Sequence, residues 1–185
     1  MSRMTKGLLA YNDLTALVEA GVIEGVRPGA INGTSIDVHL GPRFLVETWD
    51  PEVTVIDLAQ RQTPAFSSVY TDSRGFELGP KQFVLAATEE KFNLPSNISA
   101  QFLLKSTIGR AGLDHAIATW CDPGWHNSVL TLELVNNLEH HTLLLKAGMP
   151  IGQMKFYRHE AVPDHMTYSV RGRYNNDASV QKGKL

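Results

Sequence analysis

The sequence predicts an all-β domain, a sandwich or a barrel, with one short helix near its N-terminus. Short runs in which apolar and polar residues alternate recur along most of the chain. Clusters of glycine, proline, asparagine and aspartate separate these runs at fairly regular intervals, as turns do in antiparallel sheets. Helical spacing of apolar residues is confined to one short segment, and no segment repeats at a long fixed period.

The helix is expected at residues 11–20, where leucine and valine recur at a spacing that places them on one face. Asn12 or Asp13 is the expected N-cap, because a short polar side chain accepts hydrogen bonds from the free N–H groups of the first turn. Gly21 is the expected stop, since glycine adopts the left-handed conformation that ends many helices.

The first strand is expected at residues 36–40, where isoleucine, valine and leucine alternate with polar residues and a Gly-Pro pair closes the run. Residues 59–79 are polar and rich in turn formers, so we expect a loop over the domain there. Six further strands are expected at residues 53–58, 83–88, 98–105, 129–135, 141–146 and 151–158.

At 185 residues, with 43% hydrophobic and 19% charged residues, the chain has the size and composition of one globular domain. Its formal net charge of −2 provides no broad positive field, so neither nucleic acid nor an anionic membrane is an expected partner. The single cysteine, Cys121, fits a reducing compartment, and neither an 18-residue apolar run nor a signal-peptide core occurs. We therefore expect a cytoplasmic domain at residues 1–170 and a mobile tail at 171–185.

Two cations and two hydroxyls lie within six residues of one another, around a flexible glycine: Lys105, Ser106, Thr107 and Arg110. Such a segment can wrap a phosphate chain with backbone N–H groups, hydroxyls and charged side chains. The same residue types also make ordinary solvated turns. The glycine spacing is not that of a Walker loop.

Glu133 lies halfway along the strand expected at 129–135, between two leucines. Alternation places Leu130, Leu132 and Leu134 on one face of that strand and Glu133 on the other. On a solvent-facing surface the acid has no special role. If a neighbour or a ligand covers it, burial raises its pKa and makes it a proton shuttle near neutral pH.

Asp37 on its strand and Asp122 in the Asp-Pro-Gly-Trp turn are candidate partners of magnesium or of a hydroxyl, although Asp122 is also a normal turn residue. The seven histidines lack the spacing of a zinc site, and one cysteine cannot supply the Cys-x-x-Cys pair of the zinc nucleobase deaminases. The segment 167–177 interleaves tyrosines and arginines, as a disordered end or a flap over phosphates would.

Several segments resemble the dCTP deaminases of the dUTPase superfamily, in that family's order and over most of the chain. The most specific match is the ATWCDPGW turn joined to the glutamate-bearing strand; the IDV-x-LG strand is shared more broadly with dUTPases. The matching segments are INGTSIDVHLG (31–41), KSTIGRAGLDH (105–115), HAIATWCDPGWHNSVLTLELVNN (115–137), LKAGMPIGQMKF (145–156) and RGRYNND (171–177).

The resemblance implies a distorted jelly-roll subunit of the dUTPase-like β-clip type, in a homotrimer whose active sites lie between subunits. It implies zinc-independent hydrolytic deamination of dCTP to dUTP and ammonia, with magnesium brought by the triphosphate and dTTP as a possible inhibitor. Two alternatives remain on the same scaffold: a dUTPase, or a bifunctional enzyme that gives dUMP. A catalytically silent nucleotide-binding protein is a third.

By the same resemblance, Glu133 is the proton shuttle and Ala118 offers its backbone to the catalytic water. Ser106 and Arg110 hold and polarise the reaction centre. The implied substrate contacts are Lys105, Thr107, Trp120, Asp122, Tyr168, Arg173 and Tyr174.

The chain departs from the family pattern at Lys105, where arginine is usual, and at Trp120, where a cation is usual. Asp177 stands where a polar phosphate partner is expected. The turn before His115 is one residue shorter than in the family, and the stretch before Glu133 is one residue longer. A one-residue shift would turn Glu133 to the opposite face unless a β-bulge absorbs it.

Overall fold

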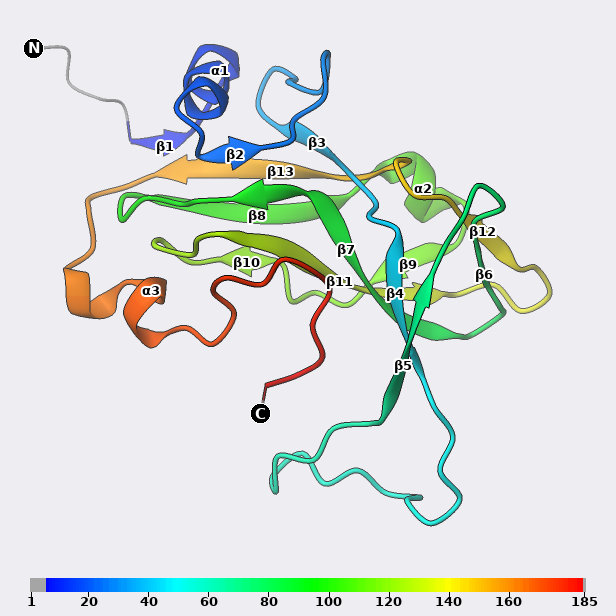
Figure 1. Ribbon diagram of the computed structural model, residues 1–185. Helices are drawn as coiled ribbons and strands as arrows, with labels where there is room; N and C mark the ends of the chain where they lie inside the picture. The colour runs from blue at the N-terminus through cyan, green and yellow to red at the C-terminus, as the bar shows by residue number, and fades with distance from the viewer. Residues whose placement is uncertain (1–5, 185) are drawn as a thin grey trace, which may run out of the picture.

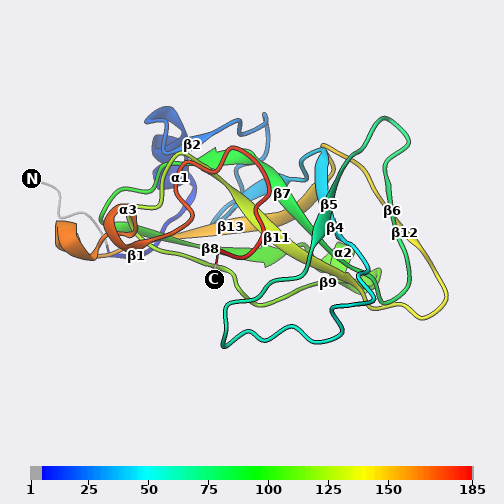
Figure 2. The same cartoon turned by 60° about the horizontal axis from the view of Figure 1, so that its bottom comes forward.

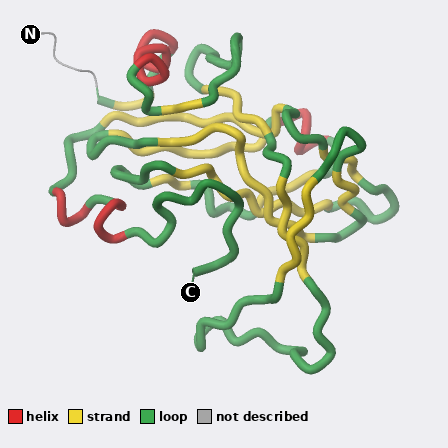
Figure 3. Tube along the Cα trace, viewed as in Figure 1, coloured by secondary structure: helices red, strands yellow, loops and turns green. Residues whose placement is uncertain are grey.

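Two stacked antiparallel sheets and a two-stranded ribbon form the structure, a computed structural model that describes residues 6–184. Every strand pair among these residues is antiparallel. Figure 1 shows the sheets packed one over the other, and Figure 3 shows how little of the chain is helical. The mostly-β fold with a short N-terminal helix is therefore confirmed.

The first sheet has the order β1-β13-β8-β10, and β3 pairs with β13 as well. Its strands are β1 (Gly7–Leu8), β3 (Ile36–His39), β8 (Ile98–Leu104), β10 (Trp120–Cys121) and β13 (Pro150–Arg158).

The second sheet has the order β5-β4-β7-β11-β9, and β2 pairs with β7 as well. Its strands are β2 (Ile23–Glu24), β4 (Arg43–Glu47), β5 (Phe66–Tyr70), β7 (Phe83–Phe92), β9 (Leu113–His115) and β11 (Ser128–Asn136). The separate ribbon pairs β6 (Phe76–Leu78) with β12 (Leu143–Leu145).

Four short helices complete the described residues: α1 (Tyr11–Glu19), α2 (Ser106–Arg110), the 3₁₀ turn η1 (Asp164–Met166) and α3 (Tyr168–Arg171). None of them has the length and apolar character that crossing a bilayer requires.

The inner faces of the two sheets meet in one main core. Phe102 on β8 and Phe156 on β13 come from the first sheet, while Phe44 on β4 and Leu132 and Leu134 on β11 come from the second; all five side chains are fully buried. Burying such side chains is the main favourable term in folding, at roughly 25 cal/mol for each Å² of apolar surface. The apolar residues that alternate along the sequence are the ones that are buried in this core. All the strands expected from that alternation are present, except one.

The exception is the strand expected at residues 53–58, which the structure places in a loop. Val53 and Val55 favour strands locally, but both are exposed, and no strand pairs with them among the described residues. The Asp57 carboxylate instead accepts hydrogen bonds from the N–H groups of Ala59 and Gln60, which forms a turn. The strand propensity of the valines is therefore not sufficient here, because no neighbouring strand within residues 6–184 pairs with this segment and no surface there buries one of its faces.

This loop joins β4 to β5 and projects away from the sheets (Figures 1 and 2). The loop expected at residues 59–79 is accordingly placed too late in the chain, because that range contains both β5 and β6.

The predicted helix is confirmed with a different start. Ala10 is the N-cap and makes no side-chain cap, so the expectation of Asn12 or Asp13 is wrong. Asp13 instead accepts a hydrogen bond from Arg158, 2.8 Å away, which ties the helix to β13. Gly21 follows the helix with φ +71°, in the left-handed conformation expected of the stop.

Candidate active site

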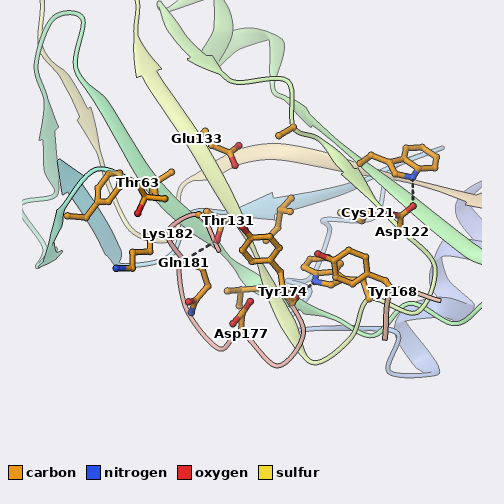
Figure 4. Close-up of a pocket in the computed structure, with 18 of the residues that line it drawn as sticks. Thr63, Cys121, Asp122, Thr131, Glu133, Tyr168, Tyr174, Asp177, Gln181 and Lys182 are labelled. Atoms are coloured by element: carbon orange, nitrogen blue, oxygen red, sulfur yellow. Dashed lines mark hydrogen bonds between the residues drawn. The ribbon is translucent and has the colours of Figure 1, made fainter. Parts of the chain in front are cut away.

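A cavity of about 630 Å³ opens beside β11, between the second sheet and the C-terminal segment. The floor includes Val129, Thr131 and Glu133 of β11, and the wall from β7 is apolar, with Phe83 and Leu85. Figure 4 shows Glu133 and Asp122 on the strand side of this space and Tyr168, Tyr174 and Asp177 on the side of the C-terminal segment. A cavity of this size and mixed lining suits a small polar ligand with an aromatic ring.

Glu133 reaches the cavity because β11 alternates. Leu132 and Leu134 are fully buried in the core, so the intervening side chain points to the other face, where it is about a quarter exposed. Burial raises the pKa of this carboxyl from 4.5 to about 7. A carboxyl with that pKa can both accept and release a proton near neutral pH.

The pairing of β11 with β7 contains an irregularity, but its surplus residues lie on β7 and not in the stretch before Glu133 where a bulge was considered. Between two paired positions β11 advances from Val129 to Thr131, while β7 goes from Lys91 to Ala87. The hydroxyl of Thr88 accepts the N–H of Leu130 at 3.0 Å and so replaces a missing ladder bond. Beyond this bulge the regular register resumes, and Glu133 is paired with Leu85.

His115 lies directly behind Glu133. Antiparallel pairing of β9 with β11 brings it there, and its Nε2 is 3.3 Å from Oε2 of Glu133. The ring packs against Phe102, with 4.9 Å between the ring centroids. Burial lowers the pKa of His115, so the imidazole is neutral at pH 7. The position of the His115 ring behind Glu133 could not be read from the sequence, because the pairing of β9 with β11 has no local signal.

Ala118, Trp120 and Asp122 all line the cavity, as the predicted site requires. The N–H of Ala118 donates to the carbonyl of Ala116 at 2.7 Å, which leaves the carbonyl of Ala118 as the group that can meet a water. The indole N–H of Trp120 donates to Oδ1 of Asp122 at 3.0 Å. Cys121 also lines the cavity, and burial raises the pKa of its thiol to about 12, so it stays protonated and is no nucleophile.

The turn that carries Asp122 also holds the C-terminal segment. The indole N–H of Trp125 donates to the carbonyl of Tyr174 at 2.7 Å. Gly124 has φ +87°, and a Cβ there would lie 2.8 Å from Cβ of Thr167. Only glycine therefore allows this turn to approach the segment so closely.

The C-terminal segment closes one side of the cavity. Tyr168 and Tyr174 line it as predicted, whereas Arg173 does not; its guanidinium donates to the carbonyl of Lys184 at 2.7 Å. Asp177, Gln181 and Lys182 also line the cavity, and the sequence did not single out the last two.

The segment is anchored by Val180, which is 2% exposed and packs with Leu45, Leu85 and Ala87. Lys184 also holds it: its ammonium lies 2.8 and 2.9 Å from the two carboxylate oxygens of Asp177.

The cations of residues 105–110 do not line this cavity. Ser106, Thr107 and Arg110 belong to α2 and are exposed, and the ammonium of Lys105 pairs with Asp37 at 2.6 Å. One chain therefore brings the acid together with the Asp122 turn and the two tyrosines, but not with Lys105, Ser106, Thr107 and Arg110. Asp37, a candidate magnesium partner, is occupied by Lys105 and by the amide of Asn32.

Among residues 6–184, no three His, Cys, Asp or Glu side chains are grouped closely enough to hold a metal ion. The acids of the cavity are separated by apolar and aromatic side chains. The site thus contains the Glu133 carboxyl, whose pKa is about 7, and the neutral imidazole of His115 next to it. It also contains the Asp122 carboxylate, which accepts a hydrogen bond from Trp120.

Comparison with known proteins finds similarity to dCTP deaminases in a family model, in curated proteins and in a solved structure. Residues 8–159 match the family described as dCTP deaminase-like. A protein of Methanospirillum hungatei JF-1 named "dCTP deaminase, dUMP-forming" is 37% identical over 150 residues, which are 80% of this chain and 79% of that protein. A protein of Corynebacterium glutamicum with the same name is 35% identical over 156 residues, 82% of this chain and 80% of the other.

Among solved structures, the 2'-deoxycytidine 5'-triphosphate deaminase from Agrobacterium tumefaciens superposes with a TM-score of 0.66 at 21% identity. The match covers 83% of this chain and 49% of that one, so this chain spans about half the length of the Agrobacterium protein. At that identity the likeness is one of fold, and it agrees with the jelly-roll expectation.

Proposed function

The chain belongs to the dCTP deaminase-like family, a family of hydrolytic deaminases, and from that membership we propose that it converts dCTP to dUMP. The first step is the hydrolytic removal of the 4-amino group, which gives dUTP and ammonia. The second is hydrolysis between the α- and β-phosphates, which gives dUMP and pyrophosphate. The two relatives described above are named dUMP-forming, and this favours the bifunctional alternative over the release of dUTP as the end product.

The observation that carries the proposal is the position of Glu133, with its pKa near 7, on the floor of the cavity. Water attacking C4 of cytosine must lose a proton, and N3 and the departing amine must gain protons. A carboxyl that titrates near neutral pH can take the first proton and deliver it onward. The carbonyl of Ala118, at the same cavity, is the backbone group suited to hold the water.

The second step needs a water directed at the α-phosphate, and Asp122 is the residue we propose for it. Its carboxylate lines the cavity, and the indole N–H of Trp120 fixes one of its oxygens. The other oxygen is thereby oriented to accept a proton from a water. The rings of Tyr168 and Tyr174, which come from the C-terminal part of the chain, are suited to pack against base or sugar.

The triphosphate requires cations that this cavity lacks, and we propose that a second copy of the chain supplies them. Ser106, Thr107 and Arg110 are exposed on α2 and are free to face a neighbouring subunit's cavity. Lys105 would exchange Asp37 for a phosphate oxygen or bridge the two. A site completed by a neighbouring copy fits the homotrimer that the family resemblance implies, with magnesium entering as part of the nucleotide complex.

The products formed from dCTP test the proposal, because each alternative leaves a different chromatogram. We expect dUMP and pyrophosphate, with dUTP as substrate giving dUMP as well. Accumulation of dUTP that the protein leaves intact would reduce the activity to deamination alone. Turnover of dUTP without turnover of dCTP would indicate a dUTPase, and nucleotide binding with no product would indicate a silent binding protein.

A further inference from the structure

Within residues 6–184, three buried side-chain nitrogen or oxygen atoms have no hydrogen-bond partner, and all three belong to one pair of residues. They are Nδ1 and Nε2 of His115 and Oε2 of Glu133. Buried polar groups are almost always paired in folded proteins, so an exception calls for an explanation. That His115 and Glu133 lie against each other at the cavity suggests that the missing bond forms in a working state.

The geometry allows this bond with a small movement. Nε2 and Oε2 are already 3.3 Å apart, and the backbone is fixed because the N–H of Ala116 donates to the carbonyl of Glu133 at 3.0 Å. Phe102 packs against the imidazole and limits its rotation. His115 does not line the cavity, whereas Glu133 does, so Oε2 is the inner oxygen and Oε1 serves the cavity.

We propose that His115 is a positioning residue, whose Nε2–H donates a hydrogen bond to Oε2 of Glu133 while Oε1 exchanges protons with water and cytosine. The inference rests on the deaminase function proposed above. In each cycle Oε1 takes a proton from the attacking water and passes it to the pyrimidine, and His115 keeps its own proton throughout.

The opposite tautomer would work against the reaction. With the proton on Nδ1, the bare Nε2 would draw a proton bound by Glu133 to the inner oxygen, away from the substrate. The neutral state of the imidazole, which burial favours, leaves one N–H to place, and Nε2 is the nitrogen that faces the acid.

Other charged groups near the pair are few. Burial is the largest influence on the pKa of His115 and lowers it, while the backbone of Ala116 and, to a smaller extent, the carboxylate of Asp114 beside it on β9 act in the opposite direction. The wall from β7 contributes only the apolar Phe83 and Leu85, while β10 and the turn after it contribute Cys121 and Asp122. The remaining titratable groups that line the cavity come from the C-terminal part of the chain: Tyr168, Tyr174, Asp177 and Lys182.

Two replacements of His115 separate positioning from packing. His115→Leu removes the donor, and His115→Gln retains an N–H at similar reach. The pKa of Glu133 is measured by ¹³C NMR on glutamate-labelled protein, with the signal identified by its absence in Glu133→Gln. A hydrogen bond to a carboxylate favours the ionised form, so His115→Leu should raise this pKa by about one unit and His115→Gln should leave it near the wild-type value.

Kinetics supply a second readout. In His115→Leu the acid limb of the kcat/KM profile should move to higher pH together with the pKa, and kcat should fall roughly tenfold or more with little change in KM. His115→Gln should restore most of the activity. A uniform loss at every pH, with the pKa of Glu133 unmoved, would overturn the inference, and so would a lowered pKa, which would mean that His115 accepts the proton.

A measurement on the wild type guards against variants that do not fold. ¹⁵N NMR of labelled histidine reports which ring nitrogen of His115 carries hydrogen, and a proton on Nδ1 would contradict the proposal. The matched control is His39→Leu, which breaks the buried pair of His39 with Glu90 outside the cavity. It should lower the Tm without moving the Glu133 signal. If the pKa shifts occur in a protein that does not deaminate dCTP, the proposed function fails while the His115–Glu133 bond stands.

Discussion

The indole N–H of Trp120 donates to Oδ1 of Asp122 across 3.0 Å, so the carboxylate of the Asp-Pro-Gly-Trp turn already has a fixed partner on β10, the strand that precedes the turn. The inner oxygen of Glu133 has none. This difference separates the two acids of the cavity. The Asp122 carboxylate is held in one orientation by this hydrogen bond, whereas Glu133 is the acid whose protonation changes near neutral pH.

Glu133→Gln should therefore abolish deamination while leaving nucleotide binding nearly intact. The substitution preserves size and most hydrogen bonds but removes the proton acceptor, and general acid–base groups contribute about 10²–10⁴-fold. We expect a loss of at least that size in the rate of dCTP deamination, measured by product chromatography. Glu139→Gln is the matched control, because its side chain is 72% exposed outside the cavity, and it should behave as wild type. Full activity in Glu133→Gln would move the search for the proton shuttle to Asp122.

The same substitution should stabilise the protein in a defined pH window. The folded protein holds a proton on Glu133 up to about pH 7, whereas the unfolded chain releases it near pH 4.5. The contribution of that proton to the free energy of unfolding is present below pH 4.5 and is lost as the pH rises through 7. The Tm of Glu133→Gln should match that of the wild type near pH 4.5, exceed it increasingly up to pH 7 and differ from it by a constant amount above. A Tm difference independent of pH would show that Glu133 is not held protonated; Glu139→Gln serves as the flat reference.

The longest core strands were predictable because alternation in strands such as β11 coincides with burial of Leu132 and Leu134. The strand expected at residues 53–58 failed for a non-local reason. Valine favours a strand only when another strand pairs with it and a neighbouring surface covers it, and Val55 has neither.

The residues of the site also fall into those that could be recognised from the sequence and those that only the fold brings together. Glu133 was singled out by its place between two leucines, Asp122 and the two tyrosines mainly by the family resemblance, and all four line the cavity. The neutral imidazole behind the acid and the tail residues Gln181 and Lys182 were missed, since only the folded chain brings them to β11.

Mixing two inactive variants should restore activity if the site spans two chains. Arg110→Ala lacks the cation and Glu133→Gln lacks the acid, and in randomly mixed trimers about a quarter of the interfaces combine an intact Arg110 with an intact Glu133. We expect dCTP turnover to reappear after co-refolding at a comparable fraction of the wild-type value. Arg110→Ala mixed with the double variant should stay inactive. A fully active monomer in sedimentation would contradict the shared site.

We expect the reaction to require the magnesium that is bound by the triphosphate, and no metal ion that is bound by the protein alone. We expect protein shown by mass spectrometry to be free of zinc to turn over dCTP when magnesium is supplied. Chelation should stop the reaction, and magnesium should restore it, because the ion screens and orients the triphosphate oxygens. Stoichiometric zinc in the active protein, with activity lost on its removal, would contradict the mechanism.

Inhibition by dTTP is the expected mode of feedback, and residues 112–116 are where it should act. Gly112 has φ +96° and packs against Leu138, and the strand that follows it brings His115 to within 3.3 Å of Glu133. Two arrangements of His115 and Ala116 would let the thymine methyl select the inactive one. We expect sigmoidal dCTP kinetics in the presence of millimolar dTTP. Hyperbolic kinetics unchanged by dTTP would mean that the switch is missing in this chain.

Val180 links the stability of the protein to the C-terminal segment that closes the cavity. Its side chain packs with Leu45, Leu85 and Ala87, and Leu85 also forms part of the cavity wall, so admitting a nucleotide by lifting this segment means partly taking apart a hydrophobic cluster. Where turnover requires this segment to lift, tighter packing of these side chains stabilises the protein and slows the opening. An organism that grows hotter would be expected to fill this cluster more tightly and accept a slower enzyme at moderate temperature.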